Sequence, residues 1–201
     1  MTFEPHTGHP SKPSEAPDLA PLPDGMVLGP GFFARSSPEV ARDLIGKILW
    51  SPGVGGGRLT EVEAYLPLGD PASHAACGPT KRNAAMFGPA GTIYVFLSYG
   101  IHYLLNLVCE QEGVGSAVLI RSLESVCGPG RVGAALQIRP GLDGALLGNA
   151  SGLYVVDDGF ASTVEVDTRI GISRGAELPL RYHARGSSCV TRRSGTREGP
   201  C

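Results

Sequence analysis

Apolar residues recur along the chain in short runs that either alternate with polar residues or continue over only a few positions. Such runs, bounded by Gly, Pro, Asn and Ser, are typical of β-strands. Residues 37–45 differ, because they open with Ser-Pro-Glu and then place their apolar side chains on one helical face. The pattern therefore predicts a strand-rich chain with a short helix over residues 37–45.

Two pairs of the predicted strands are close enough in sequence to form hairpins. A glycine-rich turn joins the first pair, and residues 98–101 join the second pair, with Tyr99 at the tip. A second short helix is predicted over residues 132–137. The expected strands cover residues 47–51, 58–65, 92–98, 102–109, 117–123, 153–156, 163–167 and 181–184. The fold class that follows is α+β, with a mainly antiparallel sheet.

Length and composition agree with one domain of ordinary size. The chain has 201 residues, of which 42% are apolar, so it can bury a sizeable core. Its 29 glycines and 17 prolines favour many turns and argue against a helix bundle. Residues 1–30 are proline-rich, carry a formal charge of −3 and lack periodicity. We therefore expect a flexible tail there and a single domain over residues 31–201.

What the sequence lacks disfavours several classes of protein and site. No apolar run is long enough to span a bilayer, and no secretory leader is recognisable, so we expect a cytoplasmic protein. The five cysteines are odd in number, widely spaced and without a Cys-x-x-Cys pair, which favours reduced cysteines. His74 and Cys77 are too few to bind a metal ion, and we expect no metal or other cofactor.

Two carboxylates lie within one predicted strand. Because side chains alternate along a strand, Glu61, Glu63 and Tyr65 share one face. The simpler interpretation is a solvated face on an edge strand, and for Glu61 we keep this structural interpretation. The alternative is a general acid or base beside an aromatic ring, which would require shielding from bulk solvent. The residues alone leave both interpretations open.

Aromatic residues concentrate in one predicted hairpin. Tyr94, Phe96, Tyr99 and Tyr103 lie within ten residues, although only 6% of the chain is aromatic. Core packing is the simpler interpretation for Tyr94 and Tyr103. The sheet cannot cover Tyr99 at the tip, and an exposed ring there favours contact with a partner. Two polar residues that need partners if buried also interrupt apolar strands: Asn106 and Arg121.

These features occur in an order and spacing that resembles the alkyladenine (3-methyladenine) DNA glycosylases. The matching segments are VEAYL, the later His74, TKRNAAMF, GTIYVFLSYGIHYLLN, AVLIRSLE, GPGRVGAAL, RIGI and LRYHARGS. The resemblance covers roughly residues 31–190, and the conjunction is far more specific than any one motif. It implies the fold of a formyltransferase C-terminal domain, with a curved sheet, short flanking helices and a protruding β-hairpin.

The resemblance implies a role for each matching residue of the site. Glu63 would be the general base that activates the hydrolytic water. Arg121 would hold that water and the base, together with a backbone carbonyl near Ile170. Three rings would line the pocket and stack on the extruded base: Tyr65, His74 and Phe96. Phe96 replaces a tyrosine of close relatives, so stacking would be kept while a hydroxyl hydrogen bond would be lost.

The resemblance also implies how DNA would be engaged and cut. Tyr99 would insert into the minor groove and fill the gap left by the flipped nucleotide. Asn106 would press on the purine edge where guanine carries its amine. The implied activity is base excision repair of alkylated or deaminated purines in double-stranded DNA: 3-methyladenine, 7-methylguanine, hypoxanthine and ethenoadenine. The three lysines lie outside the pocket motifs, so water would be the nucleophile and an abasic site the product.

The formal charge of −2 argues at first against DNA binding, but it is unevenly distributed. Residues 31–201 carry +1, and the last 21 residues carry +4. The expected contacts with the DNA backbone are Lys81, Arg82 and Arg185. Few phosphate contacts imply weak non-specific affinity and a shallow dependence on salt. We expect a monomer associated with the nucleoid.

Two other functions would use part of the same pattern. A non-catalytic nucleic-acid-binding module on the same fold would need the basic and aromatic surface but not Glu63. A hydrolase of small nucleosides would use the carboxylate but would leave no stacking gap for Tyr99 to fill.

Overall fold

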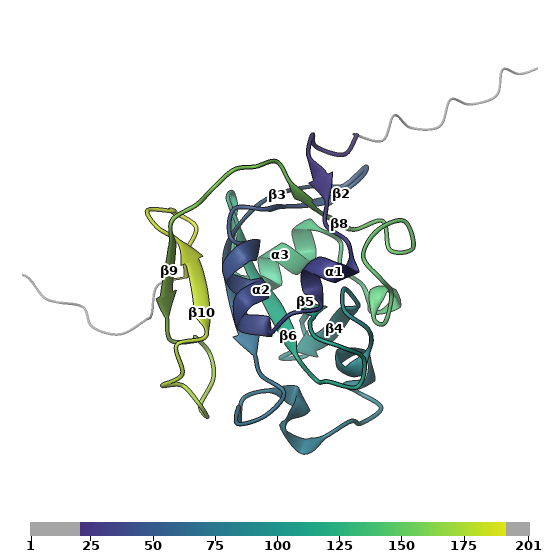
Figure 1. Ribbon diagram of the computed structural model, residues 1–201, viewed down its shortest axis with the longest axis vertical. Helices are drawn as coiled ribbons and strands as arrows, with labels where there is room; N and C mark the ends of the chain where they lie inside the picture. Colours follow the sequence, from purple (N-terminus) through teal and green to yellow (C-terminus); the bar gives the residue numbers. More distant parts are fainter. Residues whose placement is uncertain (1–20, 192–201) are drawn as a thin grey trace, which may run out of the picture.

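A curled antiparallel sheet of ten strands organises residues 21–191, the part of the chain that the computed structural model describes (Figure 1). The main path through the sheet is β1-β8-β2-β3-β6-β5-β4, while β10 pairs with β3 and β9, and β7 pairs with β6. The strands are β1 (Met26–Val27), β2 (Ile48–Ser51), β3 (Gly55–Tyr65), β4 (Ile93–Ser98), β5 (His102–Val108), β6 (Ala117–Leu123), β7 (Val126–Cys127), β8 (Tyr154–Asp157), β9 (Val164–Asp167) and β10 (Arg181–Ala184). Together with a few short helices, these strands form one domain, in agreement with the predicted α+β class.

The long strand β3 lies in the interior of the sheet. Its first residues pair with β2, and the stretch from Glu61 to Glu63 lies between β6 and β10. The ladder with β6 shifts register on both sides of Glu61, as at a β-bulge. Both carboxylates are fully buried. The interpretation of a solvated edge strand is therefore wrong, because β10, far downstream in the sequence, covers the edge.

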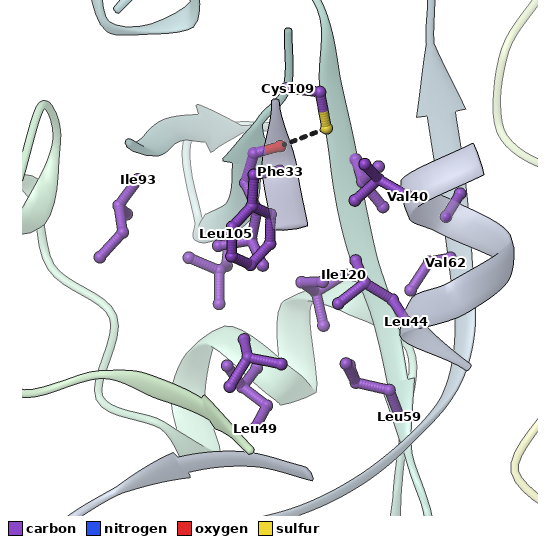
Figure 2. Close-up of a cluster of buried hydrophobic side chains, with 14 of the residues drawn as sticks. Phe33, Val40, Leu44, Leu49, Leu59, Val62, Ile93, Leu105, Cys109 and Ile120 are labelled. Carbon is purple, nitrogen blue, oxygen red and sulfur yellow. Dashed lines mark hydrogen bonds between the residues drawn. The ribbon is translucent and has the colours of Figure 1, made fainter. Parts of the chain in front are cut away.

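Helix α2 (Ser37–Leu44) confirms the predicted helix and supplies part of the core. It begins directly after Ser36, and the Glu39 carboxylate accepts a hydrogen bond from the Ser36 amide. Figure 2 shows Val40 and Leu44 of this helix pointing toward Ile120 of β6. Each such buried aliphatic side chain stabilises the fold by about 1.5–3 kcal/mol.

The shorter elements differ from the prediction. The predicted helix over residues 132–137 is α3 (Pro129–Ala135), which starts earlier because Pro129 occupies its first turn. Four single-turn elements were not predicted, since one turn shows no periodicity: α1 (Pro30–Phe33), η1 (His74–Cys77), η2 (Ala84–Phe87) and η3 (Pro140–Leu142). Part of the predicted tail, residues 21–30, is described, and Met26–Val27 pair with β8 there.

Cys127 and Cys189 form a disulfide, so the expectation of reduced cysteines is wrong for this pair. The two residues are 62 positions apart, and spacing alone does not reveal that β7 and the segment after β10 meet. Cys77 is exposed and Cys109 is buried, both as free thiols. Among residues 21–191, no helix is long and apolar enough to cross a membrane. No group of three metal-binding side chains gathers within the same range.

Candidate active site

The carboxylate of Glu63 lies fully buried on β3, with three groups in contact. The backbone amide of Ile170 donates to Oε1 at 2.8 Å, and the Tyr65 hydroxyl donates to Oε2 at 3.1 Å. Nη1 of Arg121, on β6, lies 3.2 Å from Oε1. An amide, a hydroxyl and a guanidinium therefore fix the orientation of this carboxylate.

Burial raises the pKa of Glu63, because desolvation outweighs the opposing effects of the Arg121 charge and the Ile170 hydrogen bond. A raised pKa makes the ionised carboxylate a stronger base. Arg121 is itself 5% exposed, and its Nη1 also lies 3.5 Å from the carbonyl oxygen of Ile170. The residues that the resemblance groups as base and water holders are thus adjacent in space.

A cavity of about 320 Å³ opens beside these groups, a size that suits a small planar ligand. Its lining comes from β3 to β6, from η1, η2 and α3, and from the segment after β9. It includes Tyr65, His74, Tyr94, Phe96, Asn106, Arg121 and Ile170. Glu63 lies behind this wall, and its three partners form part of the lining. Tyr65, Arg121 and Ile170 therefore separate the carboxylate from the cavity.

The aromatic wall of the cavity is uncharged. His74 and Phe96 meet edge to face, with ring centroids 4.6 Å apart. Burial lowers the pKa of His74, so the imidazole is neutral near pH 7. Its Nδ1 lies 2.7 Å from the Tyr94 hydroxyl, whose pKa burial raises to about 12. Tyr94 is 3% exposed, which confirms its core packing, and it also reaches the cavity.

Asn106 is buried on β5, and its amide group lines the same cavity. Its Nδ2 donates to the carbonyl oxygen of Tyr94 at 3.1 Å, on the neighbouring strand β4. This bond fixes the side chain in an otherwise apolar strand, and the amide oxygen accepts no hydrogen bond from the described residues. A fixed amide in a cavity wall can discriminate between purine edges.

The tip of the β4–β5 hairpin holds Tyr99 in an unusual conformation. Tyr99 and Gly100 have φ angles of 51° and 71°, and the Ile101 amide donates to the Ser98 carbonyl at 3.0 Å. Positive φ at both central residues is typical of a tight hairpin turn, but it is uncommon for a tyrosine. The ring is 88% exposed and borders the cavity. The predicted exposed tip is confirmed.

Sequence reasoning missed a buried ion pair next to the site. Arg169 donates to both oxygens of Asp70 at 2.6 and 2.7 Å, and both side chains are fully buried. The guanidinium also lies 4.6 Å from the centre of the Tyr65 ring. The two partners are 99 residues apart, so no local pattern reveals the pair. Because Arg169 precedes Ile170, the pair anchors the segment that donates to Glu63.

Glu61 was expected to have only a structural role, yet it lies beside the same arginine as Glu63. Its Oε1 is 3.3 Å from Nε of Arg121. Arg181 and Thr191 also contact this carboxylate, and neither was singled out as part of the site. The Glu-x-Glu alternation on one strand could have pointed to Glu61. The contacts of Arg181 and Thr191 with Glu61 form only in the folded protein.

The three predicted DNA-backbone residues lie away from the cavity lining. Lys81 and Arg82 are exposed in a turn between η1 and η2. Arg185 follows β10 and lies 2.8 Å from Glu165, so part of its charge is compensated. Three further arginines that contribute to the basic C-terminus lie outside the described residues: Arg192, Arg193 and Arg197.

Comparison with known proteins matches both the core strands and the segment carrying Ile170. A family model described as "Methylpurine-DNA glycosylase (MPG)" matches residues 31–128 and 124–188. A Rhodopseudomonas palustris (strain BisB18) protein named "Putative 3-methyladenine DNA glycosylase" is 43% identical over 194 residues, covering 85% of this chain and 96% of the relative. Proteins of the same name from Rhizobium meliloti (strain 1021) and Methanoculleus marisnigri (strain ATCC 35101 / DSM 1498 / JR1) are 43% and 39% identical, covering 81% and 84% of this chain and 95% and 100% of the relatives.

Proposed function

The chain belongs to the methylpurine-DNA glycosylase family, enzymes that act in the repair of alkylated DNA, and we propose that it hydrolyses the N-glycosidic bond of a purine flipped out of duplex DNA. Alkylated and deaminated purines are the proposed substrates, and an abasic site is the product. The observation that carries the proposal is Glu63, a buried carboxylate fixed by Arg121 and Ile170 behind a ring-lined cavity.

The cavity wall suits a cationic base. Purines alkylated at N3 or N7 carry a positive charge, and aromatic faces attract cations. Tyr65, His74 and Phe96 supply rings in the wall, and a neutral His74 does not repel the cation. Phe96 has no hydroxyl to read the base edge, so stacking would dominate recognition at this position. Asn106 would exclude guanine by crowding its exocyclic amine.

The proposed reaction transfers one proton from water to Glu63 and exchanges the C1′–N bond for a C1′–O bond. Glu63 takes a proton from water, the water oxygen bonds to C1′ of the deoxyribose, and the C1′–N bond electrons leave with the purine. Arg121 and the Ile170 carbonyl would hold the water, in keeping with their 3.5 Å separation. General-base assistance of this kind contributes about 10²- to 10⁴-fold. An alkylated base needs little further help, because its positive charge makes it a good leaving group.

Extrusion of the base leaves a gap that Tyr99 would fill. Flipping costs a few kcal/mol of lost stacking, and an inserted ring restores part of it. Its exposure of 88% at a protruding tip supports this role. Lys81, Arg82 and Arg185 would contact phosphates. Since these contacts are few, binding would depend only weakly on salt.

We further propose that the enzyme acts without strand cleavage and as a monomer. Cleavage by a glycosylase needs an amine that forms a Schiff base. Lys47 and Lys81, the lysines within residues 21–191, do not line the cavity. The curled antiparallel sheet is compatible with the formyltransferase-like architecture proposed for the domain.

The direct test is incubation with duplex DNA that contains one 1,N6-ethenoadenine, hypoxanthine or stable 3-methyladenine analogue. The expected result is abasic sites that become strand breaks only after alkali or an added nuclease. Breaks without such treatment would contradict the absence of strand cleavage. Binding of lesion DNA without any base release would favour a non-catalytic module instead.

A further inference from the structure

A second buried carboxylate, Glu61, lies on the opposite side of Arg121 from the proposed base. Nε of Arg121 is 3.3 Å from Oε1 of Glu61, and Nη1 is 3.2 Å from Oε1 of Glu63. All three side chains are buried. One guanidinium therefore bridges two carboxylates, of which the proposed reaction uses only one.

The surroundings of Glu61 are built to keep it ionised and immobile. Ser122 on β6 donates to Oε2 at 3.1 Å, and Arg181 on β10 donates to Oε1 at 3.0 Å. Thr191 donates to Oε2 twice, from its amide at 3.0 Å and its hydroxyl at 2.7 Å. Burial opposes ionisation, but the Arg121 charge and these hydrogen bonds outweigh it and lower the pKa of Glu61. The pKa values of the two carboxylates of this strand are thus shifted in opposite directions.

On the Glu61 side, Arg121 contacts the carboxylate by charge and donates a long hydrogen bond of 3.5 Å from Nη2 to the Thr191 hydroxyl. Its buried Nε has no hydrogen-bond partner among the described residues, although Oε1 of Glu61 is close. On the other side, Nη1 faces both Glu63 and the Ile170 carbonyl. Without Glu61, the guanidinium would be drawn to Glu63 as its only adjacent carboxylate.

We propose that Glu61 is a positioning residue that shares Arg121 with Glu63, so that Arg121 can orient water at Glu63 without pairing with Glu63 alone. This inference rests on the proposed function of Glu63 as the base. An exclusive ion pair between Arg121 and Glu63 would weaken the carboxylate as a base, because an adjacent opposite charge favours the ionised form.

Other charges face the two carboxylates and set the direction of the expected pH effect. Glu63 also senses the Tyr65 hydroxyl and the Arg169 charge, while Glu61 also contacts Arg181. If only the negative charge of Glu61 is removed, the positive charges of Arg121 and Arg169 still act on Glu63 and are no longer offset by Glu61. The pKa of Glu63 then falls, since Glu61 raises it in the native protein.

The experiment compares Glu61→Gln, Glu61→Asp and a control across a range of pH. The control is Thr92→Val, which removes a different buried hydroxyl, donating to Pro89 at 2.7 Å, outside the cavity lining. Single-turnover excision from a hypoxanthine duplex gives the plateau rate and the midpoint of the acidic limb. Thermal unfolding of each variant checks that it is folded.

Glu61→Gln is expected to lower the plateau rate about 10-fold or more and to move the acidic midpoint down by about one pH unit. Glu61→Asp keeps the charge, so its midpoint stays at the wild-type value while its rate falls. Thr92→Val lowers thermal stability but keeps the wild-type rate and midpoint. If Glu61→Gln lowers stability with an unchanged midpoint, its role is structural and the inference is wrong.

Thr191→Val provides a milder variant in case Glu61→Gln does not fold. It removes the hydroxyl that donates to Glu61 and accepts from Nη2 of Arg121, and it is expected to lower the plateau rate several-fold. An unchanged rate would contradict the inference. If the wild-type protein excises no base at all, the proposed function itself is refuted. The two failures are therefore distinguishable.

Discussion

The backbone amide of Ile170 donates a hydrogen bond of 2.8 Å to Glu63, which lies 107 residues earlier in the chain. This bond requires the segment after β9 to pack against the end of β3. Arg169 fixes that packing, because it is paired with Asp70 and also donates to the carbonyl of Ala64 at 3.1 Å. The orientation of the proposed base thus depends on a buried ion pair that never contacts it.

Asp70→Asn tests this dependence. The substitution leaves the Arg169 charge buried without its counter-charge, and breaking such a pair costs about 3–5 kcal/mol of unfolding free energy. Chemical denaturation measures the loss, and single-turnover excision should fall with it because the Ile170 amide moves. The control is Asp43→Asn, which breaks an exposed ion pair with Arg35 and should cost less than about 1 kcal/mol. Equal small losses in both variants would contradict an anchoring role.

The same pair predicts a pH dependence of stability. Burial opposes ionisation of Asp70, but hydrogen bonds from Arg169 and from backbone amides outweigh it and lower the pKa. A lowered folded-state pKa contributes stability that is fully present above the unfolded value, about 3.9, and is lost as pH falls toward the folded value. The difference in unfolding free energy between wild type and Asp70→Asn should therefore shrink as pH falls below about 4. A difference that grew on acidification would have the wrong sign.

Glu63→Gln tests the base directly. The amide oxygen can still accept from Ile170, so lesion binding should be retained, whereas excision should fall at least about 100-fold. Binding by fluorescence anisotropy and single-turnover kinetics separate the two effects. Glu112→Gln, at an exposed glutamate in the loop after β5 and outside the cavity lining, serves as a charge-matched control with wild-type kinetics. If Glu63→Gln excised the base at a rate comparable to that of the wild type, Glu63 would be excluded as the general base.

Elements that form locally could be predicted from the sequence. Helix α2 has its own start signal and apolar face, and the β4–β5 hairpin has a two-residue turn that exposes Tyr99 whatever surrounds it. The family resemblance brought the cavity residues together, and the structure places them around one cavity. The catalytic roles remain predictions.

Features that depend on distant parts of the chain could not be predicted in the same way. The sequence Glu-x-Glu looks like a solvated edge because the residues that bury it, Arg181 and Thr191, come some 120 residues later. The Asp70–Arg169 pair is equally non-local. Each partner taken alone is an ordinary surface residue type, and only the packed fold makes its charge compensated and buried.

The Cys127–Cys189 disulfide closes a long loop, and its loss should be measurable. Cys189 lies near Thr191, and its carbonyl accepts from Thr60 at 3.1 Å. Replacing both bonded cysteines with serine should lower the unfolding free energy by about 2–4 kcal/mol. It should also slow excision, because Thr191 is less well held against Glu61. Cys77→Ser, at an exposed free thiol, should change neither quantity. Thiol counting that finds both cysteines reduced in the native protein would overturn this prediction.

Tyr99→Gly should separate stability from function at the hairpin tip. Glycine adopts a φ of 51° without strain, so unfolding free energy should stay constant or rise by up to about 1 kcal/mol. Losing the ring removes about 1–3 kcal/mol of stacking with the DNA, which slows excision about 5- to 150-fold. Tyr99→Phe should retain activity, and Phe160→Ala, at another exposed ring, should leave it unchanged. Wild-type excision by Tyr99→Gly would show that the residue does not act as the wedge, and the strain at this position would then need another explanation.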